Sequence, residues 1–287
     1  MDPTSRAILL GGGGPSGPEY IGTYKFIYAK QVFPNNFGAS YQWQVPAQTK
    51  YIQAVAWGSG AQGTTSGANY AFCSYFGAQY CGSDGGGGGF STAVIPVTAG
   101  ETLYIGVGTL GSQGNVYGYN GARGRGGGFT GIFRGSTPLI IAGGGGGSGA
   151  GGNGGAGGGD PAQSTNMTPS ASGAGSYLLG GSPDGGGGYQ GGGSGSTWSN
   201  GGTGYVTATG NLYTNTVAGT YRQPPEQTHP DYVSGHGQGG QAHIVYGYTN
   251  SGWMQGLLVI HALGGGYNPA SNPSTVIPSS RTILGTY

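Results

Sequence analysis

Residues 129–159 read FTGIFRGSTPLIIAGGGGGSGAGGNGGAGGG, and two kinds of backbone meet within them. The first part holds two short apolar runs on either side of Gly135-Ser136-Thr137, a pattern typical of a β-hairpin. The second part is almost without side chains, and from Gly149 to Gly159 a residue other than Gly recurs at every third position. The first part therefore predicts strands, and the second needs a separate explanation.

Similar apolar runs lie on both sides of the Gly-rich part of the chain. They are short, rich in β-branched and aromatic residues, and bounded by Gly, Pro and Ser; almost none shows a helical period. We therefore expect an all-β fold, an antiparallel β-sandwich of jelly-roll or TNF-like type. The runs are residues 41–46, 52–57, 90–97, 102–107, 129–134, 138–142, 205–209, 211–217, 242–246 and 256–263.

The Gly-rich part has two interpretations. It could be a flexible linker. Alternatively, it is a bundle of extended glycine helices with three residues per turn, which have no internal hydrogen bonds and need partners at their sides. We favour the bundle, with structural glycines at Gly149, Gly152, Gly155 and Gly158. The predicted divisions are an N-terminal arm (1–40), a sandwich in two parts (41–142 and 205–263), the glycine insertion (143–204) and a C-terminal arm (264–287).

The composition argues against several function classes. The 287 residues include 72 Gly and 16 Pro, and only 6% are charged, with 9 basic and 8 acidic side chains. This leaves no basic surface for nucleic acid. No catalytic triad, carboxylate pair or metal shell is visible, so we expect no enzyme and no cofactor. The G-x-G-x-x-G match at 147–152 precedes no helix and carries little information. No apolar run is long enough to span a membrane.

A few polar residues deserve separate interpretations. His229, Asp231, His236 and His243 form the densest polar cluster, which is either a metal site or, as we prefer, contains solvated loop histidines. His261 in an apolar run predicts a satisfied buried or interface histidine. Cys73 and Cys81 are two free thiols, a disulfide or part of a metal site. The arginines bind an acidic sugar or, as we prefer, form a subunit interface; they are Arg123, Arg125 and Arg134.

The two ends of the chain resemble each other. Residues 3–9 read PTSRAIL and residues 278–284 read PSSRTIL. Either the similarity is chance or both ends occupy similar grooves on neighbouring copies. On the second interpretation the assembly residues are Arg6, Ile8, Leu9, Arg281, Ile283 and Leu284.

The order of these segments resembles a glycine-rich domain common in virion proteins of tailed phages and large viruses. The resemblance covers roughly residues 40–250 and lies in YQWQVP (41–46), IPVTAGETL (95–103) and LIIAGGG (139–145). LIIAGGG also resembles a region of anaplastic lymphoma kinase-type receptors, but that region is richer in cysteine and its ligand-binding role does not carry over. The resemblance implies a virion protein. Because no signal peptide is visible, we expect synthesis in a host cytoplasm and incorporation into the particle.

We therefore expect a non-enzymatic virion component that associates with itself as a surface decoration, fibre or capsid cement. Its partners would be copies of itself, as a homotrimer or larger array, and other virion proteins. One alternative is a host-attachment protein, since phage tail-tip adhesins also present loops on packed glycine helices; a second is a cellular extracellular filament or matrix protein. In the attachment alternative, loop tyrosines would contact a receptor or host-surface glycan, namely Tyr70, Tyr75, Tyr80, Tyr117, Tyr119 and Tyr189.

Overall fold

The computed structural model describes ten stretches of the chain and one isolated residue between them. The described part contains eleven β-strands and no helix. The described residues are 20–28, 40–63, 84–109, 125–148, 153–158, 178, 185–193, 199–207, 213–240, 255–268 and 282–287. The strands are β1 (Tyr20–Phe26), β2 (Tyr41–Gln44), β3 (Tyr51–Trp57), β4 (Phe90–Pro96), β5 (Thr102–Gly106), β6 (Thr130–Arg134), β7 (Thr137–Ala142), β8 (Tyr205–Val206), β9 (Tyr213–Val217), β10 (Leu257–Leu263) and β11 (Ile283–Thr286).

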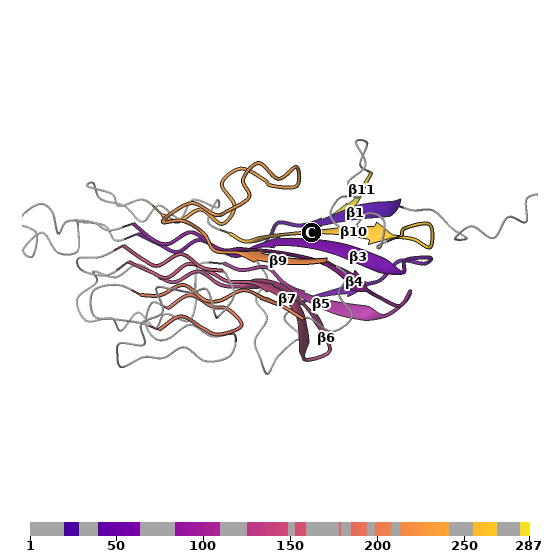
Figure 1. Cartoon of the computed structure of the whole chain (residues 1–287), viewed down its shortest axis with the longest axis horizontal. Helices are drawn as coiled ribbons and strands as arrows, with labels where there is room; N and C mark the ends of the chain where they lie inside the picture. The colour runs from indigo at the N-terminus through magenta and orange to yellow at the C-terminus, as the bar shows by residue number, and fades with distance from the viewer. Residues whose placement is uncertain are drawn as a thin grey trace, which may run out of the picture.

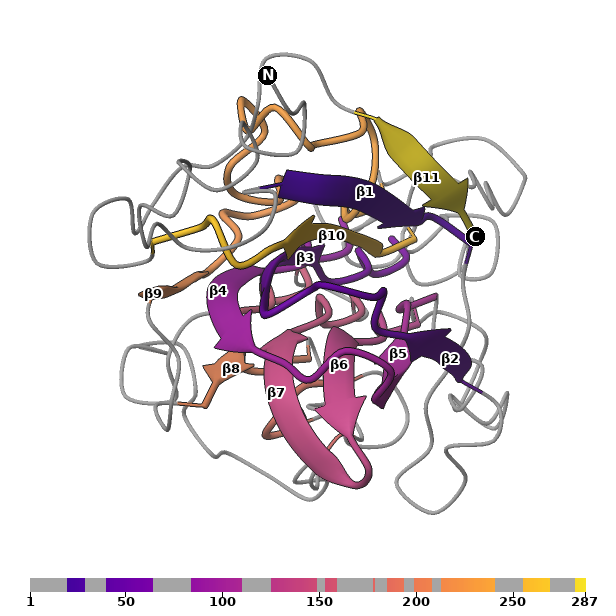
Figure 2. The same ribbon diagram turned by 90° about the vertical axis from the view of Figure 1, so that its right-hand side faces the viewer.

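The strands form two sheets that face each other (Figure 2). One sheet has the order β11-β1-β10-β3-β4-β9, and the other has the order β2-β5-β6-β7-β8. All paired strands are antiparallel except β1 and β11, which run parallel. The all-β class and the two packed sheets agree with the predicted sandwich.

The main core lies between the sheets and uses one face of most strands. On β10, Leu258 and Ile260 pack into it with Ile140 and Ile132 of the second sheet. The alternate residues of β10 belong to another apolar cluster, which includes Tyr232 and Val233 of the segment 218–240. Because that segment covers the second face, β10 is buried along its whole length. The segment is thereby fixed against the sheet.

Nine of the ten predicted runs overlap strands, and residues 242–246 lie outside the described residues. The predicted arms differ from the structure. Residues 20–26, which we assigned to the N-terminal arm, form β1 inside the six-stranded sheet, and residues 283–286 of the predicted C-terminal arm form its edge strand. The place of both strands depends on pairing with partners far away in the chain, which local sequence does not encode.

The strands continue into extended segments that run side by side away from the sandwich (Figure 1). Residues 58–63 continue β3, residues 84–89 lead into β4, and residues 143–148 continue β7. The Gly-rich backbone is therefore a continuation of the sheets, to which stretches outside the predicted insertion 143–204 also contribute.

Candidate functional site: a glycine lattice

Extended Gly-rich segments pack against one another through backbone hydrogen bonds, and we call this assembly the glycine lattice. Most of its residues are buried although they bury almost no side chain. Its segments are residues 58–62, 84–89, 125–128, 143–148, 153–158, 185–193, 199–203 and 237–240.

Residues 85–89 show how the lattice is bonded. Their successive N–H groups donate to different neighbouring segments in turn, and residues three apart donate to the same segment. The donor and acceptor pairs are Gly85 to Gly240 (2.9 Å), Gly86 to Gly146 (3.0 Å), Gly87 to Tyr221 (2.7 Å), Gly88 to Gly237 (2.7 Å) and Gly89 to Gly143 (2.8 Å).

Two further segments repeat this period of three. A strand in a sheet alternates between two sides, so a period of three requires neighbours on three sides. In residues 153–158, Gly154 and Gly157 donate to Asp84 and Gly87, while Gly155 and Gly158 donate to Ser199 and Gly202. In residues 199–203, Ser199 and Gly202 donate to Gly147 and Gly144, while Asn200 and Thr203 donate to Gly193 and Gln190.

At several positions the spacing of the segments leaves no room for a side chain. A Cβ atom on Gly86 would lie 2.0 Å from the carbonyl oxygen of Gly155, and one on Gly145 would lie 2.1 Å from that of Gly86. Real Cβ atoms essentially never approach so closely. At Gly155 the nearest atoms would be 3.3 Å away, so the lattice is not equally tight everywhere. Glycine is therefore required at the tight positions because the backbones themselves are in contact.

A small polar cluster lies at the edge of the lattice. The Tyr221 hydroxyl donates to the carboxylate of Asp84, Arg222 lies 3.9 Å from the same carboxylate, and Asp84 N donates to the Asn153 side-chain oxygen (2.9 Å). The hydrogen bond to Asp84, then burial and the carboxylate charge, raise the pKa of Tyr221, against the opposing charge of Arg222. These contacts connect residues 221–222 to two lattice segments.

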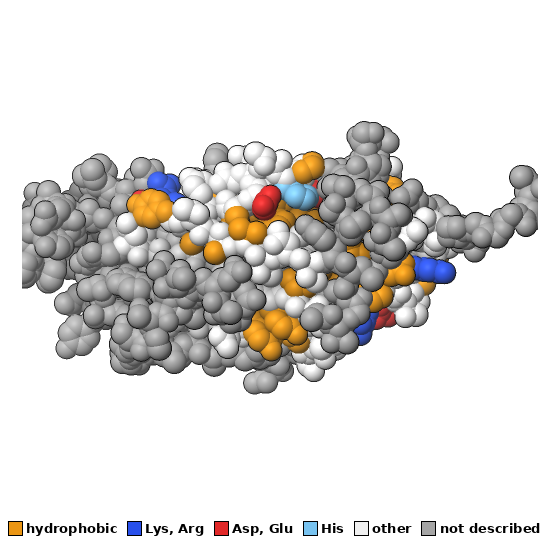
Figure 3. All heavy atoms as spheres, in the orientation of Figure 1, with side chains coloured by type: hydrophobic (Ala, Val, Ile, Leu, Met, Phe, Trp, Pro, Cys, Tyr) orange, Lys and Arg blue, Asp and Glu red, His pale blue; other side chains and the backbone are white. Residues whose placement is uncertain are grey.

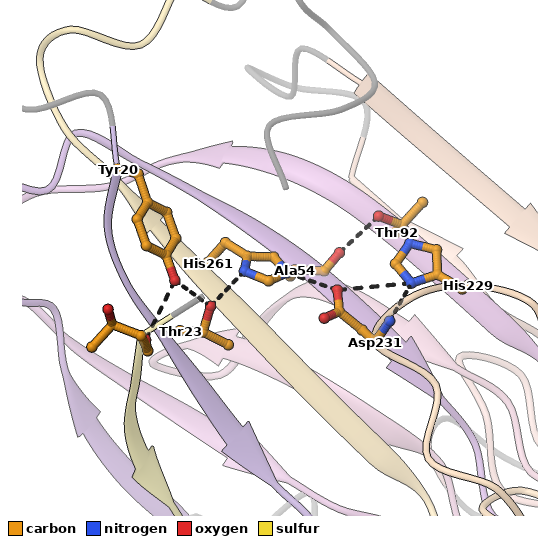
Figure 4. Close-up of polar contacts among 8 residues, drawn as sticks. Tyr20, Thr23, Ala54, Thr92, His229, Asp231 and His261 are labelled. Carbon is orange, nitrogen blue, oxygen red and sulfur yellow. Dashed lines mark hydrogen bonds and ion pairs between the residues drawn. The ribbon is translucent and has the colours of Figure 1, made fainter. Parts of the chain in front are cut away.

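A second polar cluster is buried beneath the segment 218–240 (Figure 4). The Thr23 hydroxyl lies 2.8 Å from His261 Nδ1, and His261 Nε2 lies 2.7 Å from a carboxylate oxygen of Asp231. The Tyr20 hydroxyl extends the chain of contacts, 2.6 Å from the Thr23 hydroxyl. His229 N δ1 accepts a hydrogen bond from Asp231 N (3.1 Å).

Hydroxyl, imidazole and carboxylate groups in this order occur in hydrolytic triads, but here Thr23, His261 and Asp231 are each 0% exposed. A substrate has no access to a group with no exposed surface. The arrangement instead satisfies three buried polar groups and attaches the segment 218–240 to strands β1 and β10. The predicted satisfied, buried His261 is confirmed.

The solvated loop that we predicted for the histidines does not extend to Asp231, whose carboxylate is buried against His261. His236 is half-buried, with Nδ1 3.1 Å from the Gly256 carbonyl oxygen, and His243 lies outside the described residues. Within the described stretches, no group of three His, Cys, Asp or Glu side chains is placed to hold a metal ion. The apolar run around His261 was the signal that this histidine needs a polar partner.

The structure places only part of the predicted assembly and receptor residues. Ile283 and Leu284 lie on the edge strand β11, half-exposed. Tyr189 stacks on Tyr205 with ring centroids 4.0 Å apart, and Gly155 and Gly158 lie in the lattice. The remaining predicted residues lie outside the described part of the chain: Arg6, Ile8, Leu9, Arg281, Tyr70, Tyr75, Tyr80, Tyr117, Tyr119, Gly149, Gly152, Cys73 and Cys81.

Arg134 forms its hydrogen bonds within the same chain. Its guanidinium donates to both carboxylate oxygens of Glu101 (2.8 and 3.0 Å) and to the Pro96 carbonyl (2.9 Å). Burial alone would raise the pKa of Glu101, but hydrogen bonds from Arg134 and Thr98 N, with the charge of Arg134, lower it below its ordinary value. Arg125 is exposed, and Arg123 lies outside the described residues.

Neither protein-family models nor curated proteins match this chain. In the described ranges there is no helix with the length and hydropathy needed to cross a membrane. The lattice and the two polar clusters are therefore the structural features that bear on function.

Proposed function

We propose that the chain is a non-enzymatic structural component of a virion surface, and that its glycine lattice is a rigid bundle of polyglycine-type helices. The observation that carries the proposal is the period of three in the donated hydrogen bonds. An extended helix with three residues per turn directs successive N–H groups to three sides. Such a bundle is held by its backbone and needs no reactive side chain.

The tight packing supports a mechanical role. Because many N–H groups in the lattice donate to neighbouring segments, each segment is attached to others instead of moving as a separate loop. The backbone contacts at Gly86 and Gly145 leave no space for rearrangement by side chains. A body of this kind can extend the sandwich without a large apolar core of its own.

The surface also fits close packing among copies. The formal net charge is +1, so long-range repulsion between copies is small. One face of the molecule carries few charged side chains among the described residues (Figure 3). We propose self-association as a decoration, fibre or cement component, with a homotrimer or larger array as the assembled form. The jelly-roll or TNF-like subtype of the sandwich likewise stays a prediction.

Host attachment is the second candidate, favoured by the lattice bonds of residues that flank the tyrosine-bearing parts of the sequence. Gln62 N donates to Arg125 O, and Gly154 N donates to Asp84 O, so four segments of the lattice are bonded there in two pairs. Tyr70, Tyr75 and Tyr80 belong to the chain between residues 63 and 84, and Tyr117 and Tyr119 to that between 109 and 125.

The two candidates separate by experiment. Particles released from cells that carry the native gene are purified on a density gradient and labelled with an antibody against the chain. A structural component sediments with the particles and labels their surface in many copies. Recovery of the chain only in the particle-free fraction contradicts the proposal. Binding of the purified chain to a glycan array, lost in the double variant Tyr117→Ala/Tyr119→Ala, supports attachment instead.

A further inference from the structure

The edge strand β11 presents an incompletely covered surface. Thr23 N donates to Thr282 O (3.0 Å), and Tyr287 N donates to Lys25 O (2.9 Å), which fixes one side of the strand to β1. In the parallel register, Thr23 lies opposite Ile283, so the backbone N–H and C=O of Ile283 point away from β1. On that side β11 has no strand partner among the described residues.

The side chains of this edge are also partly uncovered. Ile283 is 50% exposed and Leu284 is 49% exposed, while Leu284 also covers Gly22 of β1. Tyr287 beyond them stacks on Phe26 with ring centroids 4.8 Å apart. Among the described residues, the edge therefore combines backbone groups without a strand partner with an apolar Ile-Leu pair, the two features that added β-strands use.

The sequence itself contains a matching segment. Residues 3–9 (PTSRAIL) repeat residues 278–284 (PSSRTIL), with identical residues at five of the seven positions. Parallel, in-register pairing of the two segments would set Ile8 beside Ile283 and Leu9 beside Leu284. Like apolar side chains in register cover one another well.

We infer that the N-terminal segment of a second copy adds to the free edge of β11 as a parallel strand, with its Ile8 and Leu9 beside Ile283 and Leu284. A parallel connection within one chain needs a crossover of about a dozen or more residues. Only residues 10–19 separate the segment from β1, and the crossover would also have to pass β11. A neighbouring copy needs no crossover.

This inference rests on the self-association in the proposed function and specifies its geometry. The contact joins two different surfaces, the N-terminal segment of one copy and the β11 edge of the next. Repeated contacts of this type give a closed ring or an open chain of copies.

The test uses the full chain with one contact surface changed at a time. Ile8→Asp alters the arm, and Ile283→Pro removes the outward N–H of the edge, while Ile283→Val is the matched control that keeps it. Sedimentation velocity over a concentration series measures the size, and circular dichroism verifies folding. Each of the first two variants should raise the half-association concentration by at least about tenfold, and Ile283→Val should not.

Mixing the variants gives the sharpest result. The Ile8→Asp chain keeps its edge and the Ile283→Pro chain keeps its arm, so an equal mixture should form pairs and nothing larger. If either variant alone retains the wild-type association, or the mixture forms no pairs, the inference is wrong while self-association stands. If the wild-type chain stays monomeric throughout, both fail. A peptide of residues 2–10 should also inhibit wild-type association, unlike its scrambled sequence, and no inhibition would contradict the inference.

Discussion

The sandwich and the glycine lattice are built from the same strands but are stabilised in opposite ways. In the sandwich, side chains such as Ile140 and Ile260 fill the space between the sheets. In the lattice, glycine has no side chain, so the backbones lie in direct contact, as Gly86 does with the carbonyl group of Gly155. The hydrophobic effect dominates in the first region. In the second, satisfaction of buried peptide groups decides which arrangement is stable.

The difference predicts opposite responses to added and removed volume. The largest effect is expected for Gly86→Val. Its Cβ would lie 2.0 Å from the carbonyl oxygen of Gly155, and this backbone cannot move without breaking other hydrogen bonds of the lattice. We expect loss of at least about 3 kcal/mol of unfolding free energy, measured by denaturant titration. Gly155→Ala is the matched control, since its Cβ would meet atoms at 3.3 Å. Equal midpoints for the two variants would show that the lattice is loose.

Shortening a buried side chain should lower the unfolding free energy when the side chain lies in the sandwich core. Ile140→Ala leaves a cavity between the sheets and should cost about 2–5 kcal/mol in the same titration. Ile283→Ala, at a 50% exposed position, serves as the control and should cost much less. Because β7 continues into residues 143–148, we also expect earlier loss of hydrogen-exchange protection in both regions of the Ile140→Ala variant. Unchanged protection of the lattice would mean that the regions unfold independently.

The buried polar cluster should link the sandwich to the segment 218–240. Asp231→Ala leaves His261 Nε2 without its partner and should cost about 1–3 kcal/mol. Asp231→Asn retains an oxygen acceptor and should cost less. Limited proteolysis measures the local consequence, and faster cleavage within residues 218–240 is expected for Asp231→Ala. Identical cleavage in the two variants would exclude a specific role for this contact.

The smallest effect concerns the ion pair of Glu101 and Arg134, whose side chains are 20% and 44% exposed. Glu101→Gln should cost less than about 1 kcal/mol at pH 7 because solvent screens the pair. The pKa of Glu101 is lowered in the folded chain, so its contribution exists above the ordinary carboxyl pKa and disappears as pH falls through the lowered value. Thermal unfolding at pH 7 and pH 2 should therefore show a difference only at pH 7. A difference that grows in acid would contradict this assignment.

Local sequence predicts most of the sandwich and little of the arrangement of the lattice. Runs such as Tyr51–Trp57 and Leu257–Leu263 are apolar and bounded by turn residues, so their strands are visible in isolation. The positions of β1 and β11 depend on distant pairing, as shown by Tyr20 opposite Leu263. In the lattice, Gly-rich segments look alike, and no residue of 85–89 indicates that 143–148 and 237–240 are its neighbours.

For a similar reason, the sequence predicts only one member of the buried polar cluster of Thr23, His261 and Asp231. His261 in an apolar run signals a need for a partner, but Thr23 lies 238 positions away and Asp231 lies 30 positions away. Their meeting depends on the pairing of β1 with β10 and on the segment 218–240 covering β10. The sequence indicates that His261 needs hydrogen-bond partners, whereas the fold shows that these partners are Thr23 and Asp231.

Amide hydrogen exchange of the intact chain tests the lattice most directly. If its backbone groups are bonded as described, amides of residues 85–89, 143–148, 153–158 and 199–203 should exchange as slowly as those of β3 and β10. Exchange of these Gly-rich amides at the rate of an unfolded peptide, while β3 and β10 remain protected, would contradict the lattice and with it the proposed structural role.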